Sequence, residues 1–157
     1  MRIRPATLGD LPRVQELFGA LHAYNSSLAP EFQLSADWPA LFAETFRRTV
    51  DAPDHLWALA WDGDEAVGLI VGEHHVDPPI FGGHPWFELS ALYVAPSHRR
   101  AGVARLLTEH LEAWARAHGY DIVQLYVSAA NRSARDFYGR QGYAPLQEIW
   151  RKELPPA

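Results

Sequence analysis

The chain has 157 residues, of which 48% are hydrophobic and 21% charged, and its formal net charge is −5. These are ordinary globular values, so we expect one folded domain over residues 1–157 rather than disorder. There is no cysteine, which excludes disulfides, thiolate metal sites and a cysteinyl intermediate. No apolar run approaches the roughly 20 residues that span a bilayer, and the N-terminus lacks the apolar segment of a signal peptide. We therefore expect a cytoplasmic protein that binds no membrane.

The charge is unevenly distributed along the chain. Residues 1–85 carry 12 acidic and 5 basic side chains, a balance of −7, and residues 86–157 carry 7 acidic and 9 basic, a balance of +2. A nucleic-acid-binding protein normally presents a broad basic face, so we expect no nucleic acid as a partner. An anionic cofactor on the basic part and a cationic acceptor on the acidic part would suit this polarity, although chance surface composition would also explain it.

Hydrophobic spacing predicts the elements of the first half. Thr7 and Asp10 resemble a capping box at the start of a first helix, and Asp37 can cap a second. The expected order is a strand at 2–5, a helix to about residue 21, a loop at 25–37, a helix to about residue 50, strands at 56–61 and 66–75, and a long loop at 76–85.

The second half predicts a strand at 88–94, a helix that opens at Val103 and stops at Gly119, a strand at 122–127, a helix at 133–141 and a last strand at 143–154. The 122–127 run is mostly apolar, which is typical of a strand buried on both faces. The resulting order, β-α-α-β-β-β-α-β-α-β, predicts an α/β fold (α+β mixed sheet) with helices on both faces.

A basic turn between the strand at 88–94 and the following helix is suited to phosphate. Unpaired amides at a helix start attract anions, and the small residues Gly102 and Ala104 let the backbone approach closely. Arginines there would add charge and forked donors, unless they simply lie in solvent. The pattern Arg99-x-x-Gly102-x-Ala104 after a strand resembles the acetyl-CoA signature of the GCN5-related N-acetyltransferase (GNAT) family.

A second motif resembles the same family. It reads Asn131-x-x-Ala134-x-x-Phe137-Tyr138-x-x-x-Gly142-Tyr143. A capped helix with an aromatic pair and a glycine stop would account for Ala134, Phe137 and Gly142, but not for Asn131 or the Tyr138 hydroxyl. The two motifs occur in the family's order, and the resemblance extends over essentially the whole chain.

The resemblance implies a GNAT-like fold with splayed central strands, in which the strand before the basic turn carries a bulge. Its free backbone groups would bind acetyl-CoA, the co-substrate. The implied cofactor-binding residues are Leu92, Tyr93, Val94, Arg99, Arg100, Ala101, Gly102, Val103, Ala104, Arg105, Asn131 and Tyr138. The Leu92 amide would stabilise the oxyanion, and Tyr138 would protonate the departing thiolate. The reference pKa of tyrosine, about 10, is close to that of a thiol.

The general base is left open between two glutamates and a water chain. In histone-acetylating members of the family, a glutamate on the corresponding strand deprotonates the amine. Glu88 has the matching position in this chain. If the strands at 66–75 and 88–94 form a hairpin, Glu73 lies nearly opposite Glu88 and could contact the substrate. Two solvated glutamates with water acting as the base would be the alternative.

The implied reaction moves an acetyl group from acetyl-CoA directly onto a primary amine, in a ternary complex, as an acyltransferase (acetyl-CoA-dependent N-acetyltransferase). Tyr24, Phe32 and Trp38 could wall an acceptor pocket or simply belong to the core. The alternative function is a catalytically silent acyl-CoA-binding or regulatory module. His74 and His75 point to opposite faces of a strand, so we predict no metal. A homodimer is an option that the resemblance leaves open.

Overall fold

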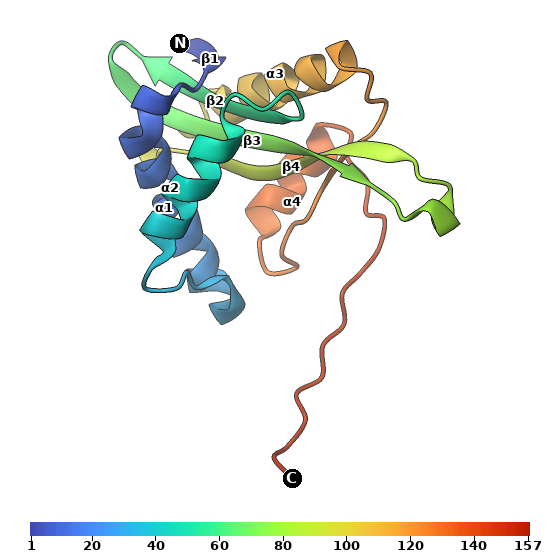
Figure 1. Cartoon of the computed structure of the whole chain (residues 1–157). Helices are drawn as coiled ribbons and strands as arrows, with labels where there is room; N and C mark the ends of the chain where they lie inside the picture. Colours follow the sequence, from blue (N-terminus) through green and yellow to red (C-terminus); the bar gives the residue numbers. More distant parts are fainter.

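A five-stranded sheet organises the chain, and the computed structural model describes all 157 residues (Figure 1). Its strands lie in the order β1-β2-β3-β4-β5, antiparallel except for the parallel pair β4–β5. The strands are β1 (Arg2–Pro5), β2 (His55–Asp62), β3 (Glu65–Val76), β4 (Pro85–Val94) and β5 (Val123–Leu125). The helices are α1 (Leu11–Leu28), α2 (Trp38–Thr49), α3 (Val103–Ala117) and α4 (Arg132–Arg140), with short 3₁₀ turns at Leu8–Asp10, Pro30–Phe32, Pro79–Phe81 and Pro96–His98.

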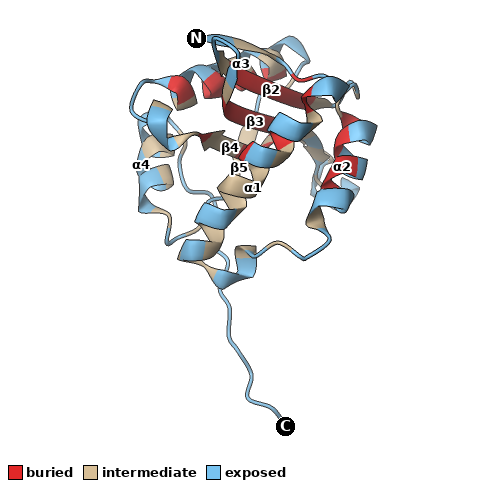
Figure 2. Cartoon of the chain, turned by 90° about the vertical axis from the view of Figure 1, so that its left-hand side faces the viewer, coloured by how far each residue is buried: buried red, intermediate tan, exposed pale blue.

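Two hydrophobic cores lie on opposite faces of this sheet (Figure 2). One face packs against α3, whose buried stripe includes Val103, Leu107 and Leu111. The other packs against α1 and α2 and includes Phe42 and Phe46. Helices on both faces confirm the predicted layering.

A bulge in β4 changes which face its side chains point to. Ala91 pairs with Val71 and Leu89 pairs with Gly72, which leaves Ser90 as an extra residue without a partner. Successive side chains of a strand alternate between faces, so the extra residue reverses the alternation. Glu88, before the bulge, thereby shares the α1–α2 face with Ala91, after it.

Several element boundaries differ from the prediction. α1 continues to Leu28, into the stretch predicted to be a loop, and β5 is a half-buried edge strand rather than one covered on both faces. The predicted last strand at 143–154 is wrong: residues 144–157 form no helix or strand, and every one of them is exposed. A strand needs a neighbouring strand for its backbone groups, and this segment has none. No helix has both the length and the apolar character needed to cross a membrane.

The predicted capping box at Thr7 and Asp10 is present and is reinforced by Arg4. The Asp10 carboxylate accepts hydrogen bonds from the Thr7 amide and hydroxyl at 2.7 and 2.9 Å and a forked pair from the Arg4 guanidinium at 2.8 and 2.9 Å. These donors, the Arg4 pair above all, lower the pKa of Asp10 to about 2. The Asp10 side chain is 10% exposed and the Arg4 side chain 32% exposed, so solvent screens this pair in part.

We expect Asp10→Asn to reduce the free energy of unfolding by about 2 kcal/mol at neutral pH. The folded state favours ionised Asp10, so this stabilisation is present above about pH 4 and is lost as the pH falls towards 2. Denaturant titrations at several pH values measure it. Glu16→Gln, which breaks an exposed pair with Arg13, is the control and should change stability by less than about 0.5 kcal/mol. An Asp10→Asn effect as small as that would contradict the prediction.

Candidate active site

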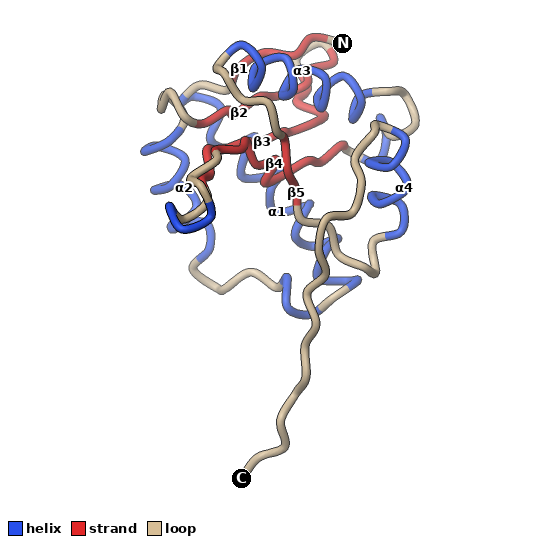
Figure 3. Tube along the Cα trace, turned by 90° about the vertical axis from the view of Figure 1, so that its right-hand side faces the viewer, coloured by secondary structure: helices blue, strands red, loops and turns tan.

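The strands β4 and β5 separate beyond the bulge. Their pairing is confined to Phe87, Glu88 and Leu89, whereas β4 continues to Val94 with no strand on that side (Figure 3). The Ala95 amide bonds to the Val67 carbonyl of β3 at 2.8 Å. Hydrogen-bonded pairs alternate along an antiparallel ladder, so the amides of Leu92 and Val94 point the other way, into the gap. The predicted bulge and splay are therefore both present.

The turn that follows β4 is locally strained. Arg100 has φ 63° and is the single non-glycine residue with a positive φ, a conformation that costs roughly 1–2 kcal/mol. Such strain is concentrated at functional sites. Gly102, at φ 80°, adopts the left-handed region without that cost, and no side chain caps α3 there. The first amides of α3 consequently lack acceptors within the helix and can bind an anion.

The arginines of the turn differ in their contacts. The Arg99 Nε donates to the Val94 carbonyl at 3.1 Å, and its guanidinium carbon lies 5.7 Å from the ring centroids of both Tyr24 and Tyr93. Arg99 thus supports the end of β4 and connects it to α1. Arg105 pairs with Glu109 along α3 at 3.3 Å, and both side chains are exposed.

Helix α4 carries the second motif beside the gap. The side-chain Oδ1 of Asn131 accepts a hydrogen bond from the Ala134 amide at 3.1 Å, so Asn131 is the N-cap of α4 and its side-chain NH₂ group is left for another partner. Capping therefore does account for Asn131. Tyr138 packs against the α3-side core, and burial raises its pKa to about 12. The neighbouring Tyr143 donates its hydroxyl to Glu112 at 2.9 Å.

A cavity of about 510 Å³ lies on the α1–α2 face and ends at the bulge. Its apolar wall comes from α1, α2, the segment before α2 and the strands β2, β3 and β4. It consists of Phe18, Leu34, Trp38, Leu41, Phe42, Trp57, Val71 and Ala91. Its polar lining is Gln33, Ser35, Thr45 and Thr49, together with His22, His55, Glu73 and Ser90. Glu73 is the sole aspartate, glutamate, lysine or arginine of this lining. The cavity reaches Ser90 and Ala91, one residue short of Leu92.

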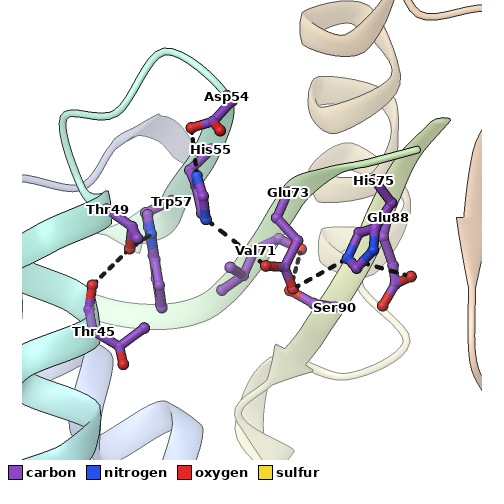
Figure 4. A network of polar contacts seen from close by, with 10 residues as sticks. All are labelled: Thr45, Thr49, Asp54, His55, Trp57, Val71, Glu73, His75, Glu88 and Ser90. Atoms are coloured by element: carbon purple, nitrogen blue, oxygen red, sulfur yellow. Dashed lines mark hydrogen bonds and ion pairs between the residues drawn. The ribbon is translucent and has the colours of Figure 1, made fainter. Parts of the chain in front are cut away.

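Glu73 belongs to a row of ionisable side chains on the cavity side of the sheet (Figure 4). Glu73 pairs directly with Glu88 across β3 and β4, which confirms the expected register. His75 Nε2 lies 3.9 Å from Glu73 and 3.7 Å from Glu88, and His55 Nε2 lies 3.7 Å from Glu73. His55 Nδ1 contacts Asp54 at 2.7 Å. The separations beyond 3.5 Å are too long for direct hydrogen bonds but are within the range of ion pairs when the histidine is protonated.

The same cluster bears on metal binding. Ligand atoms of Glu73, His75 and Glu88 lie within 4.8 Å of one another, so these side chains could hold a small cation. The sequence argument rejected a metal held jointly by His74 and His75, and His74 is not a member of this cluster. The prediction that the protein uses no metal remains a prediction.

The family assignment follows from a comparison with family models. Residues 19–143 match the model of the acetyltransferase (GNAT) family. The chain belongs to this family. Its matched region contains the splayed strands, the strained turn and both motifs, so the resemblance inferred from Arg99, Gly102, Ala104 and Asn131 is confirmed at the level of the family.

Curated GNAT relatives match this chain over part of their length. A mycothiol acetyltransferase from Beutenbergia cavernae is 31% identical over 129 residues, covering 80% of this chain and 41% of that protein. The catalytic subunit of the Schizosaccharomyces pombe N-terminal acetyltransferase B complex is 35% identical over 83 residues, covering 46% of each. The chain thus spans less than half the length of these relatives.

Solved structures support the GNAT fold over the full chain. A tetramutant of the BH1408 protein from Bacillus halodurans has a TM-score of 0.87 at 24% identity, covering 98% of this chain and 100% of that one. An aminoglycoside 6'-N-acetyltransferase from Acinetobacter haemolyticus has a TM-score of 0.77 at 20% identity, with both chains fully covered. At these identities the likeness shows the fold alone.

The structure brings together some of the predicted site residues and separates others. Leu92, Tyr93, Val94 and the turn lie on one side of the gap, with Asn131 and Tyr138 on α4. Of the three aromatic residues proposed for the acceptor pocket, Trp38 lines the cavity, whereas Tyr24 lies beside Arg99 and Phe32 is outside the lining. Sequence reasoning missed Phe18, His22, Phe42, Trp57 and His55. Phe18 and Phe42 occupy apolar positions with helical spacing, and this signal does not distinguish a core residue from one that lines a cavity.

Proposed function

We propose that the protein transfers the acetyl group of acetyl-CoA directly to a primary amine held in the cavity of about 510 Å³. The observation that supports this is that the cavity ends at Ser90 and Ala91, where the unpaired edge of β4 begins. An acceptor in the cavity and a thioester along Leu92–Val94 would meet at the bulge. Neither ligand would block the other, which favours a ternary complex.

Each step of the reaction has a candidate group at this point. Glu73 would take the proton of the ammonium, and the neutral nitrogen would attack the thioester carbon. The Leu92 amide, which points into the gap, would stabilise the oxyanion. The carbon–sulfur bond would then break, the nitrogen would lose its second proton to solvent water as the amide forms, and Tyr138 would donate a hydrogen bond to the departing thiolate. Glu88 would support the base through His75.

The lining favours an acceptor with one cationic amine and an aromatic or other apolar body. Glu73 is the single carboxylate that lines the cavity, so a polyamine or an aminoglycoside would leave further ammonium groups without partners. The ring centroids of Phe18 and Phe42 lie 4.4 Å apart, and the Trp57 ring meets the Phe42 ring edge-on with a centroid distance of 5.7 Å. These rings form an aromatic wall. The buried Nδ1 of His22 has no partner and could bond one polar group of the acceptor.

Acetylation of a panel of amines tests both the transfer reaction and the proposed class of acceptor. We expect 2-phenylethylamine and tryptamine to release free thiol from acetyl-CoA with a kcat/KM at least tenfold above those of spermidine and kanamycin. Turnover should persist after dialysis against EDTA, since the base, the oxyanion donor and the hydrogen-bond donor to the thiolate are all protein groups. Faster reaction with kanamycin or spermidine would overturn the acceptor class, and faster reaction with a lysine-containing peptide would assign a protein substrate.

A catalytically silent acyl-CoA-binding module is the competing function. It would bind acetyl-CoA in calorimetry and release no thiol with any amine of the panel. The aromatic cavity and the paired glutamates next to the acetyl position argue against it, because a module that only binds the cofactor has no need of either.

A further inference from the structure

Three ionisable side chains beside the acceptor cavity converge on one point. Ligand atoms of Glu73, His75 and Glu88 lie within 4.8 Å of one another. Glu73 and Glu88 are direct partners across β3 and β4, and His75 follows Glu73 by two residues, on the same face of the sheet. Figure 4 shows the His75 ring directed toward both carboxylates. All three side chains are carried by paired strands, which hold a site more precisely than loops do.

One atom of this group lacks the partner that a buried polar atom normally has. The Nε2 atom of His75 is buried and makes no hydrogen bond. It lies 3.9 Å from Oε1 of Glu73 and 3.7 Å from Oε2 of Glu88, whereas a protonated imidazole bonded to a carboxylate would approach to about 2.7–2.9 Å. The ring stacks on Trp86 at a centroid distance of 5.5 Å, which fixes its plane. The three atoms therefore surround a gap instead of closing a direct contact.

The group carries more negative charge than the protein balances. Glu73 and Glu88 form ion pairs with histidines alone, and neither has a lysine or arginine nitrogen within 4.0 Å. Two carboxylates this close repel each other unless a cation or a shared proton lies near them. A proton on His75 would offset one of the two charges. A divalent cation in the gap would offset both and would also give the buried Nε2 atom a partner.

We propose that Glu73, His75 and Glu88 bind Zn²⁺, and that the bound ion inhibits acetyl transfer. Imidazole is a zinc ligand, whereas Mg²⁺ and Ca²⁺ take oxygen ligands. Zinc–ligand distances of about 2.0–2.1 Å place neighbouring ligands of a tetrahedral site roughly 3.3 Å apart, so the observed separations need to close by about 0.5 Å. Three protein ligands leave a fourth position for water. The ion is an inhibitor and not a cofactor, which agrees with the turnover expected after EDTA treatment.

Glu73 connects the zinc site to the acceptor cavity. Its Oε1 atom faces His75, and its Oε2 atom lies 3.7 Å from Nε2 of His55, its direct partner on β2. Asp54 contacts Nδ1 of His55 at 2.7 Å, so a second layer of polar groups orients this carboxylate, as is common for metal ligands. Glu73 also lines the cavity, which gives the ion a way in. Inhibition, unlike binding, rests on the proposed role of Glu73 as the base: zinc would occupy its lone pair and repel the ammonium of the acceptor.

Calorimetric titration of the full chain with ZnCl₂ tests the site without any need for turnover. We expect one ion per chain and no measurable heat from MgCl₂ at the same concentrations. His75→Phe, which keeps a ring against Trp86, and Glu88→Gln should each raise the zinc dissociation constant by roughly 100-fold or more. The matched control is His84→Ala, because His84 pairs with Asp121 at 3.0 Å outside the group, and it should change the constant less than twofold. Absence of saturable binding, equal binding of Mg²⁺, or unchanged affinity in either ligand variant would overturn the site.

Acetylation of 2-phenylethylamine with and without zinc tests the inhibition. The amide product is quantified by chromatography, because zinc also binds the free thiol of CoA. Saturating zinc should lower kcat/KM roughly 100-fold, and EDTA should restore it. His84→Ala should be inhibited equally, whereas His75→Phe, compared with its own zinc-free rate, should lose less than half of that rate at the same zinc concentration. Full turnover with zinc bound would overturn the inhibition. A chain that binds zinc as expected but acetylates no amine would contradict the proposed function and support the site.

Discussion

Replacing Tyr138 with phenylalanine should lower kcat for acetyl transfer by roughly 100-fold and change the dissociation constant of acetyl-CoA less than threefold. The substitution removes the hydroxyl alone and keeps the ring, which packs against the α3-side core. Because the hydroxyl would act on the thiolate that forms during the reaction, its loss should affect turnover and spare ground-state binding. Initial rates with saturating amine, together with calorimetric titration of acetyl-CoA, measure the two quantities.

The raised pKa of Tyr138 refines the role of its hydroxyl. At about 12, with burial as the cause, the phenol is a weaker acid than an ordinary thiol, whose pKa is near 8.5. Complete proton transfer to the thiolate is therefore uphill, and the near-equal acidity assumed from the reference pKa of tyrosine does not hold. The hydroxyl would instead donate a hydrogen bond to the leaving sulfur and stay protonated. Ionisation of Tyr138 should accordingly not limit kcat below about pH 11.

Tyr143→Phe is the matched control for this prediction. Its ring centroid lies 5.6 Å from that of Tyr138, and its hydroxyl is bonded to Glu112 rather than free. We expect this variant to lose about 1 kcal/mol of unfolding free energy and to keep kcat within twofold. If Tyr138→Phe behaved in the same way, the hydroxyl of Tyr138 would have no part in the chemistry.

Much of the cofactor side could be predicted because it depends on local sequence. Gly102 is needed where the backbone is left-handed, and Asn131 is a helix cap, so both functions require particular residue types at fixed spacing. The direct pairing of Glu73 with Glu88 was also predictable from a hairpin centred on the 76–85 loop.

The acceptor cavity and the conformation of residues 144–157 depend on tertiary packing and could not be predicted from local sequence. The bulge was expected from the family resemblance alone, and nothing in the residues around Ser90 shows where it falls or that it places Glu88 on the cavity side of the sheet. Phe18 and Phe42 follow the apolar periodicity of their helices, but periodicity cannot show that these side chains line a cavity. The prediction of a strand over residues 143–154 failed because strand formation needs a partner edge, which the sequence of the segment cannot supply.

The second large effect is expected for Glu73→Gln, which should lower kcat/KM at pH 7 by roughly 100-fold. Glu73 lines the cavity with a side chain 37% exposed, whereas Glu88 is 13% exposed and lies outside the lining. An ammonium in the cavity therefore meets Glu73 first. Without this base, the reaction depends on the small fraction of acceptor that is already neutral. That fraction rises about tenfold per pH unit below the pKa of the amine, so the variant should recover activity as the pH increases.

The pH profile separates a base from a residue that only binds the amine. Loss of a binding contact alone would raise KM and leave the shape of the kcat profile unchanged, whereas loss of the base steepens the profile on its alkaline side. Glu88→Gln should lower kcat/KM less than Glu73→Gln does, because Glu88 acts through His75 across 3.7 Å. The control is Glu65→Gln, since Glu65 is an exposed glutamate at the start of β3, the strand that carries Glu73. This substitution should leave the rate unchanged. If Glu88→Gln instead gave the larger loss with alkaline recovery, the base would be Glu88, and the acceptor amine would have to reach beyond Glu73 to meet it.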